Sequence, residues 1–434
     1  NAPPITEILA KFVVNHPSQG WSEAVDEQAH RTFANWMGCA IGASRHPTLE
    51  AALRAVMVLK PAPQASILGR SERVDIANAA LLNGISSHTF DFDDTHLKTI
   101  IHPAGPVASA AYAAHELFGT TGRELIDALV LGIEVSCRVG NSMYPDHYDR
   151  GWHITGTTGM LGAAASCARL LKLTPEQTQM ALGIAASQPV GLREQFGTMT
   201  KPFHPGGAAK AGLMSALMAR EGFTASPKAL EAPRGLIQVI SDKCDWREIT
   251  EGLGVHWESA LNTYKPFACG IVIHPSIDGC VQLRDQHGVK PADIAKIVLK
   301  VHPLVIELTG KKTPQRGLEG KFSVYHSCAV GLLYGKAGEH EYSDEAVRHP
   351  EVIAIRDLVE AIVDEEMDEA AADVTVITKD GKRHQVLVEH AIGSLERPMS
   401  NAQLKAKFID QASAVIGAAD AEKAWERELH FGRK

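Results

Sequence analysis

The sequence lacks the signatures of several protein classes. Its seven cysteines form no CxxC pair, and it contains no HExxH motif and no EF-hand spacing, so the common zinc and calcium patterns are missing. It has no run of basic residues, and a net charge of −8 with a pI near 6.2 argues against a nucleic-acid partner. We therefore expect reduced cysteines that serve packing, in a cytoplasmic protein that binds no nucleic acid.

Long apolar runs are equally scarce. The longest one, from Leu125 to Cys137, is interrupted by Asp127 and Glu134. It falls short of the roughly 18 uncharged residues that a membrane span needs. The N-terminal residues also show no signal-peptide pattern, so we expect no membrane partner.

What the sequence does contain is an extended helical pattern. Apolar residues recur with helical spacing from Ile5 to Val13, and Thr174 to Gln177 combine an N-cap, a proline at the first helical position and a capping-box glutamine. Similar composition, bounded by Gly, Pro or Asn, predicts further helices. They cover residues 25–43, 48–59, 75–90, 107–118, 122–140, 155–171, 174–187 and 206–221.

The pattern changes after about residue 267. The tracts Ile294–Val301 and Val374–Glu389 are rich in β-branched residues, and Asp380-Gly381 inside the second tract is a strong hairpin signal. The tail from Ser400 is helical again. Because the chain exceeds the roughly 250 to 300 residues of a single core, we predict two domains and a mainly α fold. These are a large all-helical domain of residues 1–266, completed by 398–434, and a smaller α+β lid domain of residues 267–397.

The stretch DFDDTHLKTIIHPAG, from Asp91 to Gly105, gathers acids and histidines within a few residues. DFDDT fits the DxDx[TV] pattern of phosphotransferases, but that chemistry needs a buried parallel strand before Asp91, and residues 75–90 read as helical. The acids with His96 or His102 are candidates for a hard-cation site. A solvated helix end and proton transfer without a metal are the remaining interpretations.

Similar junctions favour proton transfer. Lysine or histidine precedes a helix start at His153, at Lys201 and His204 before a helix expected from near Ala208, and at Lys265. Free amide groups in a first helical turn bind carboxylate or phosphate, and the positive helix end disfavours an imidazolium. These features indicate an anionic substrate and neutral histidines that accept protons.

A glycine series follows the second junction. Gly156, Gly159 and Gly162 give a GxxGxxG spacing, but no strand precedes them. We therefore predict close helix packing instead of a dinucleotide-binding loop.

Five motifs occur in a fixed order over essentially the whole chain: DFDDT followed by HP, GWH, TKPFHPGGAAKAG, YKPF and FSVYHS. In this order they resemble the MmgE/PrpD family, which includes 2-methylcitrate dehydratase and cis-aconitate decarboxylase. The resemblance implies an all-helical domain with an α+β lid, an active site between the domains, a homodimer, and no metal or organic cofactor. Matching the motifs implies that the site residues are Asp91, Thr95, His102, His153, Lys201, Lys265 and Tyr325.

His96 and Lys98 depart from the family's dehydratases, which commonly have Trp after DDT. Taken whole, the chain resembles the epimerase branch of the family, which implies inversion at a carbon that bears an amine and a carboxylate, as in iminodisuccinate. Such an epimerase removes a proton α to a carboxylate by general-base catalysis and needs cations to stabilise the intermediate.

We therefore predict two groups of site residues. The catalytic residues are His102, His153, Lys201, Tyr325 and Asp91, with Asp91 orienting His102 and two of the others forming the acid/base pair. The substrate-binding residues are Lys265, Arg193, Thr95, His96, Lys98 and His204. A dehydratase acting on a 2-methylcitrate-like acid and a non-catalytic carboxylate-binding protein are the alternative functions.

Overall fold

The structure, a computed structural model, describes residues 1–433 and is mainly helical, as predicted. Internal contacts divide the chain into two compact units. Unit 1 comprises Asn1–Thr89, Asp93–Thr263 and Phe408–Lys434, and unit 2 comprises Phe90–Phe92 and Tyr264–Lys407. Among the helices of residues 1–433, none combines the length and the apolar character that a bilayer crossing demands.

Unit 1 is built almost entirely of helices. They are α1 (Ile5–Asn15), α2 (Glu23–Gly42), α3 (Pro47–Val58), α4 (Ile76–Thr89), α5 (Ala104–Phe118), α6 (Gly122–Met143), α7 (Asp146–Asp149), α8 (Ile154–Leu170), α9 (Pro175–Ala186), α10 (Thr200–Arg220), α11 (Leu236–Ile240), α12 (Arg247–Thr250) and α20 (Ala418–Leu429). Helix α19 (Asn401–Ile416) passes from unit 2 into unit 1 at Phe408. The short strands are β1 (Ala65–Ser66) and β2 (Arg73–Val74), which pair antiparallel, and β3 (Asp94–His96), which pairs with β4 (Asn262–Tyr264).

The predicted helices of this unit are present, and the predicted capping box at Thr174 and Gln177 is formed. The start expected near Ala208 was wrong, because α10 begins at Thr200. Pro202 lies in the first turn, where amide groups have no intrahelical partner, and the helix also continues through Pro205. Lysine and histidine of this motif are therefore helical residues.

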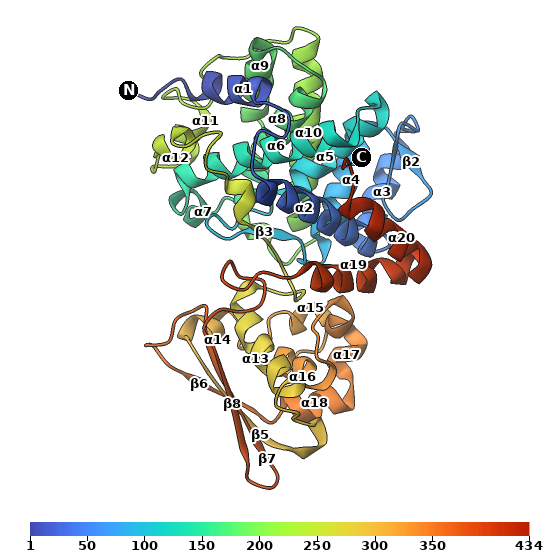
Figure 1. The fold of residues 1–434 in the computed structure, drawn as a ribbon, viewed down its shortest axis with the longest axis vertical. Coiled ribbons are helices and arrows are strands. Elements are labelled where there is room, and N and C mark those ends of the chain that lie inside the picture. The colour runs from blue at the N-terminus through green and yellow to red at the C-terminus, as the bar shows by residue number, and fades with distance from the viewer. Residues whose placement is uncertain (434) are drawn as a thin grey trace. The chain divides into compact units, whose positions relative to one another are not determined.

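Helix α8 is the central element of unit 1. It is buried around nearly its whole circumference and packs against α5, α6, α9 and α10 (Figure 1). Its glycines permit this approach: a Cβ at Gly156 would collide with the carbonyl oxygen of Val190, and one at Gly162 would collide with Ser136 Oγ. A Cβ at Gly159 would lie 2.5 Å from the ring of Pro106. The prediction of close helix packing for GxxGxxG is confirmed.

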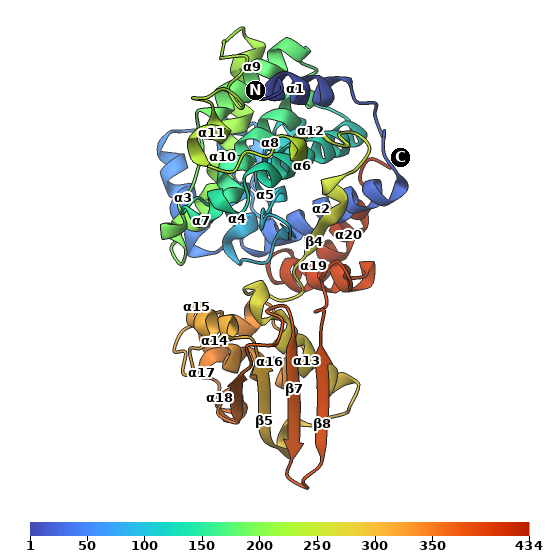
Figure 2. The same cartoon turned by 90° about the vertical axis from the view of Figure 1, so that its left-hand side faces the viewer.

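Unit 2 combines a four-stranded sheet with helices (Figure 2). Its elements are α13 (His274–Asp285), β5 (Ile294–Val301), α14 (Pro303–Thr309), α15 (Gly317–Gly320), α16 (Val324–Tyr334), α17 (Asp344–Arg348), α18 (Pro350–Arg356), β6 (Val359–Val363), β7 (Ala372–Thr378) and β8 (Arg383–Val388). The strand order is β6-β5-β7-β8, with β5 and β6 parallel and the other pairs antiparallel. The hairpin predicted at Asp380-Gly381 joins β7 to β8, and α13 packs on these two strands.

Candidate functional site

Four buried histidines of unit 1 form a continuous row. They come from the last turn of α4, the segment before α5, the residue preceding α8 and the start of α10: His88, His102, His153 and His204. Ring centroids are 5.1 Å apart for His88 and His102, 5.9 Å for His88 and His153, and 5.0 Å for His153 and His204. None of the four is more than 6% exposed. A buried cluster of titratable side chains is typical of a functional site.

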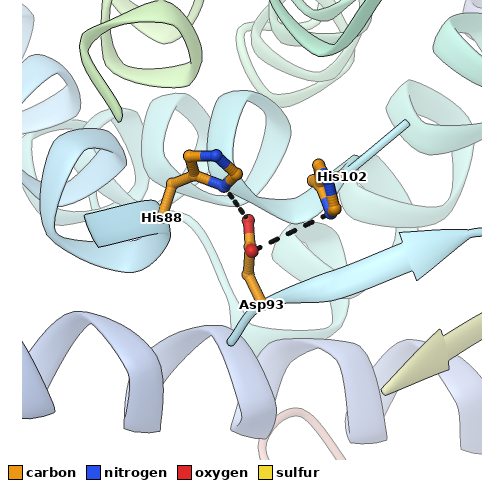
Figure 3. A group of neighbouring side chains, drawn as sticks. All are labelled: His88, Asp93 and His102. Atoms are coloured by element: carbon orange, nitrogen blue, oxygen red, sulfur yellow. Dashed lines mark hydrogen bonds and ion pairs between the residues drawn. The ribbon is translucent and has the colours of Figure 1, made fainter. Parts of the chain in front are cut away.

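Asp93 faces two of these histidines (Figure 3). Its Oδ2 accepts a hydrogen bond from Nδ1 of His88 at 2.7 Å, and its Oδ1 lies 3.8 Å from Nδ1 of His102. The Asp93 side chain is almost fully buried. A carboxylate in this position accepts a hydrogen bond from an imidazole and so fixes the orientation of its ring.

The same three side chains are also candidate metal ligands, because one ligand atom of each lies within 4.8 Å of the others. Two imidazoles and a carboxylate suit several transition metals. In the structure, however, Nδ1 of His88 is bonded to Asp93, and Nδ1 of His102 donates to the backbone carbonyl of Asp94 at 2.8 Å. These hydrogen bonds occupy Nδ1 of both rings, so the Nε2 atoms are the ones left to accept a proton or to bind a ligand.

His102 is oriented mainly by neighbouring backbone and hydroxyl groups. Besides the Asp94 carbonyl, the Oγ1 of Thr95 lies 3.2 Å from its Nδ1, and its backbone amide donates to Oγ1 of Thr155 at 3.0 Å. The bond to a carbonyl requires a hydrogen on Nδ1, which leaves Nε2 with the free electron pair. The structure thus brings together His102 and Thr95, two of the predicted site residues.

Asp94 is buried like Asp93, and its carboxyl has a raised pKa. Burial and the neighbouring Asp93 raise the pKa of the Asp94 carboxyl to about 7. Its Oδ2 accepts hydrogen bonds from the amide of Ala104 at 3.0 Å and from Nδ2 of Asn262 at 2.8 Å. Asp94 therefore fixes the start of α5, just after His102.

His153 and His204 form a direct pair. Their Nδ1 atoms are 2.8 Å apart, so one ring donates a hydrogen bond to the other. Burial, with His88 and Lys201 nearby, lowers the pKa of His153 well below its usual value. The same causes lower the pKa of His204 to about 4. Both pKa values are lowered, which agrees with the neutral imidazoles that the sequence predicts at these helix starts. The largest cause, however, is burial and not the positive end of the helix.

Lys201 lies beside this pair through an aromatic contact. Its Nζ is 4.6 Å from the ring centroid of Phe196, and the edge of the same ring meets His153 at 5.0 Å. Arg193 instead lies over the ring of Tyr148 at 4.3 Å and donates to the Tyr148 carbonyl at 3.1 Å. Of these two predicted cations, Lys201 is therefore the one whose contacts link it to the histidine row.

Two further predicted cations of unit 1, His96 and Lys98, meet acidic partners. Nε2 of His96 lies 3.2 Å from Oε2 of Glu258, and Nζ of Lys98 lies 3.6 Å from Oε1 of the same residue. Lys98 also pairs with Glu248 at 3.2 Å. Because acidic side chains already contact His96 and Lys98, a substrate-binding role for these two residues stays a prediction.

In unit 2, three lysines donate to three consecutive carbonyl groups, those of Phe90 and of the first two residues of the DFDDT motif. The Nζ to O distances are 2.7 Å for Lys321 and Phe90, 3.1 Å for Lys265 and Asp91, and 2.6 Å for Lys407 and Phe92. Lys265 also donates to Oδ1 of Asp91 at 2.7 Å, and Asp91 has a left-handed φ of 52°. Asp91 and Lys265, both predicted site residues, thus form an ion pair in which Lys265 is buried and Asp91 is partly exposed. The predicted role of Asp91 in orienting His102 stays a prediction.

Tyr325, the remaining predicted site residue, lies in the first turn of α16 in unit 2. Its side chain is buried, and burial raises the pKa of its hydroxyl. Nζ of Lys312 lies 5.8 Å from its ring centroid. These contacts neither support nor oppose a catalytic role.

The sequence predicts no role for His88 or Phe196, and for Asp93 only the candidate cation site that it shares with the other acids of the motif. His88 stands only three positions before Asp91, at the end of a segment that was read simply as a helix. Asp93 was noted within the motif, but the sequence does not distinguish it from its neighbours. The pairing of histidine with the acid five positions later depends on the turn between α4 and β3, which sequence spacing does not define.

Comparison with known proteins gives the family. The MmgE/PrpD N-terminal domain matches residues 7–249, and the MmgE/PrpD C-terminal domain matches residues 267–431. The chain belongs to the MmgE/PrpD family, which confirms the resemblance drawn from its motifs.

Several relatives of the chain are named as enzymes. It is 27% identical to a cis-aconitate decarboxylase-like protein of Aspergillus oryzae, over 95% of this chain and 91% of the relative. It is 26% identical to the cis-aconitate decarboxylase of Aspergillus terreus, over 99% and 93% of the two chains. It is 22% identical to the 2-methylcitrate dehydratase of Escherichia coli, over 90% and 86%. These relatives are thus similar over nearly their full length.

Proposed function

We propose that this protein is an enzyme that removes a proton from the carbon next to a carboxylate of a small polycarboxylate. The observation that carries this proposal is the buried row of histidines with Lys201 beside it. Burial keeps His153 neutral near pH 7, so its imidazole is able to accept a proton. A nearby ammonium group stabilises the enediolate-like charge that develops when the C–H bond breaks.

The surroundings of the row favour an anionic substrate. His153 directly precedes α8, so the start of this helix offers amide groups next to its side chain. Lys201, in the first turn of α10, contributes its ammonium group instead, because the amides of Thr200 and Lys201 already donate to Thr198. Arg193 and His204 are further proposed substrate-binding residues. On the strength of the family resemblance we also propose roles for Asp91, Thr95, Lys265 and Tyr325.

The specific reaction we propose is epimerisation of an amino-polycarboxylate such as iminodisuccinate. One group takes the proton from the stereogenic carbon, and a second group returns a proton to the opposite face. A row that contains several imidazoles offers two such groups, which supports inversion. We propose that the reaction proceeds by acid–base chemistry of the side chains, as the family resemblance implies.

The second candidate is a dehydratase acting on a 2-methylcitrate-like hydroxy acid, which the similarity to 2-methylcitrate dehydratase favours. This reaction begins with the same proton removal and then expels hydroxide, so the two candidates require the same base. A homodimeric state and a cytoplasmic location stay predictions.

Deuterium exchange separates these candidates. Metal-stripped protein is incubated in D₂O with iminodisuccinate, 2-methylcitrate or cis-aconitate, and deuterium uptake, configuration, alkene absorbance and released CO₂ are followed. Exchange with inversion and no alkene supports the epimerase, whereas alkene formation from the hydroxy acid supports the dehydratase. Loss of CO₂ from cis-aconitate would instead favour the decarboxylase activity named for two relatives. Binding without any exchange would refute the proposed proton abstraction.

Two substitutions test the proposed site. His153→Ala and Lys201→Ala should each lower kcat by roughly 10² to 10⁴, the range that general acid–base groups contribute. Lys210→Ala is the matched control, because Lys210 lies in the same helix and its Nζ contacts Asn78 Oδ1 at 3.2 Å. Near-normal turnover in both test variants would remove this site from the proposal.

A further inference from the structure

His88 is held by a buried carboxylate in one defined orientation. Its Nδ1 lies 2.7 Å from Oδ2 of Asp93. His88 is 2% exposed and Asp93 is 1% exposed. A carboxylate only accepts hydrogen bonds, so Nδ1 of His88 carries the hydrogen. The electron pair of the neutral ring is therefore on Nε2.

Nε2 of His88 is buried, and the described residues offer it no hydrogen-bond partner. Leaving a buried polar atom in this state is unfavourable, because nothing compensates for the water that it has lost. Native proteins satisfy the large majority of such atoms, and the exceptions require an explanation. A substrate or intermediate that meets Nε2 supplies one.

The position of the ring agrees with this explanation. Its centroid lies 5.1 Å from that of His102 and 5.9 Å from that of His153, so His88 stands between two residues already proposed to transfer protons. Asp93 is placed to stabilise the imidazolium that forms when Nε2 takes a proton. A carboxylate behind a histidine also holds the ring in the productive tautomer.

We infer that Nε2 of His88, supported by Asp93, is one of the two proton-transferring groups of this site. The inference rests on the proposed function and specifies its acid/base pair. The substrate C–H bond breaks, its electron pair delocalises into the adjacent carboxylate, and the proton forms the N–H bond at Nε2. In epimerisation a second group gives its proton to the opposite face of the carbon, and exchange with solvent restores both groups.

His88→Asn tests the inference sharply. The Asn amide nitrogen occupies nearly the place of Nδ1 and keeps the hydrogen bond to Asp93, but nothing replaces Nε2. We expect deuterium exchange at the substrate carbon to fall 10² to 10⁴-fold in kcat, with KM within about threefold of wild type. If His88 had only a structural role, the folded variant would keep a kcat close to that of wild type. Retention of kcat within threefold would therefore overturn the inference.

Two companion variants complete this experiment. Asp93→Asn keeps the shape but removes the charge, so kcat should fall and the acid limb of its pH profile should shift. His30→Asn is the matched control: His30 is equally buried in unit 1, and its ring nitrogens each lie 2.8 Å from a backbone carbonyl. Its kcat per folded molecule should stay within about twofold. Activity that returns to stripped protein only with a divalent metal would overturn the proton-transfer role.

Nitrogen NMR decides the question without turnover. Histidine is labelled with ¹⁵N, and the His88 resonances are assigned by their loss in His88→Asn. We expect a protonated Nδ1 and an unprotonated Nε2 near pH 7.5, and the opposite tautomer would overturn the inference. If this tautomer is present but no polycarboxylate exchanges a proton, the proposed function is refuted. The proton-transfer role of His88 is then refuted with it, whereas the hydrogen bond between His88 and Asp93 is not.

Discussion

His204 should make the protein sensitive to acid. Its ring is 1% exposed, and burial, with His88 and Lys201 nearby, lowers its pKa from 6.5 to about 4. The unfolded chain therefore binds more protons than the folded chain between these two values. By linkage, the neutral ring contributes stability that is fully present above pH 6.5 and is lost as the pH falls towards 4.

The expected magnitude follows from the shift. The pKa of His204 is 6.5 in the unfolded chain and about 4 in the folded protein. At roughly 1.36 kcal/mol per pKa unit, this difference corresponds to about 3 kcal/mol of unfolding free energy. We expect somewhat less, about 2 kcal/mol, because water relaxes the charged ring as the site titrates. His204→Asn keeps a polar group near Nδ1 of His153 but does not titrate, so its stability should fall less on acidification.

The assay is urea unfolding of wild type and His204→Asn at pH 7.5, 6, 5 and 4, followed by circular dichroism. The difference between the two proteins should change by about 2 kcal/mol across this range in favour of the variant. His390→Asn, at a half-exposed position of unit 2, is the control and should run parallel to wild type. Parallel curves for His204→Asn would refute the assignment of a neutral, buried imidazole.

Two other acid or base groups give predictions of their own. The pKa of Asp94 is raised from 3.8 to about 7, so the folded protein holds the proton of this carboxyl more tightly than the unfolded chain does. The resulting contribution to the free energy of unfolding is lost as the pH rises from about 4 to about 7. Asp94→Asn should therefore gain up to about 4 kcal/mol relative to wild type between pH 4 and pH 8 in the same unfolding assay. Lys407→Met removes a charge-assisted hydrogen bond to the carbonyl of Phe92 and a contact with its ring at 4.1 Å. It should destabilise unit 2 by about 2 kcal/mol, visible as faster limited proteolysis, and an unchanged cleavage rate would contradict this role.

Much of the helical architecture follows from local sequence. Caps and apolar spacing identify the helices because these features act over a few residues, as at Thr174 and Gln177. The hairpin at Asp380-Gly381 is equally local. The start of α10 was missed because proline was read as a boundary, whereas early helical positions tolerate it.

The site was predicted less completely, since its contacts join residues far apart in the chain. His153 and His204 meet across 51 positions, and no local pattern specifies that their Nδ1 atoms lie 2.8 Å apart. The hydrogen bond from Lys407 to the Phe92 carbonyl spans 315 positions. Residue types at helix starts identified the candidates, but their partners depend on tertiary packing.

The three acids of the DFDDT motif lie close together in the sequence, but each has a separate partner in the structure. Asp91 pairs with Lys265, Asp93 faces His88, and Asp94 binds the start of α5. The division between units passes through this motif, because Phe90–Phe92 belong to unit 2 and Asp93 begins the next segment of unit 1. A single short segment therefore supplies acidic side chains to both units. Replacing Asp91 should leave the hydrogen bonds of Asp93 and Asp94 in place, whereas replacing Asp93 should also lower the pKa of Asp94, because the Asp93 charge helps to raise it. The three positions are therefore not interchangeable.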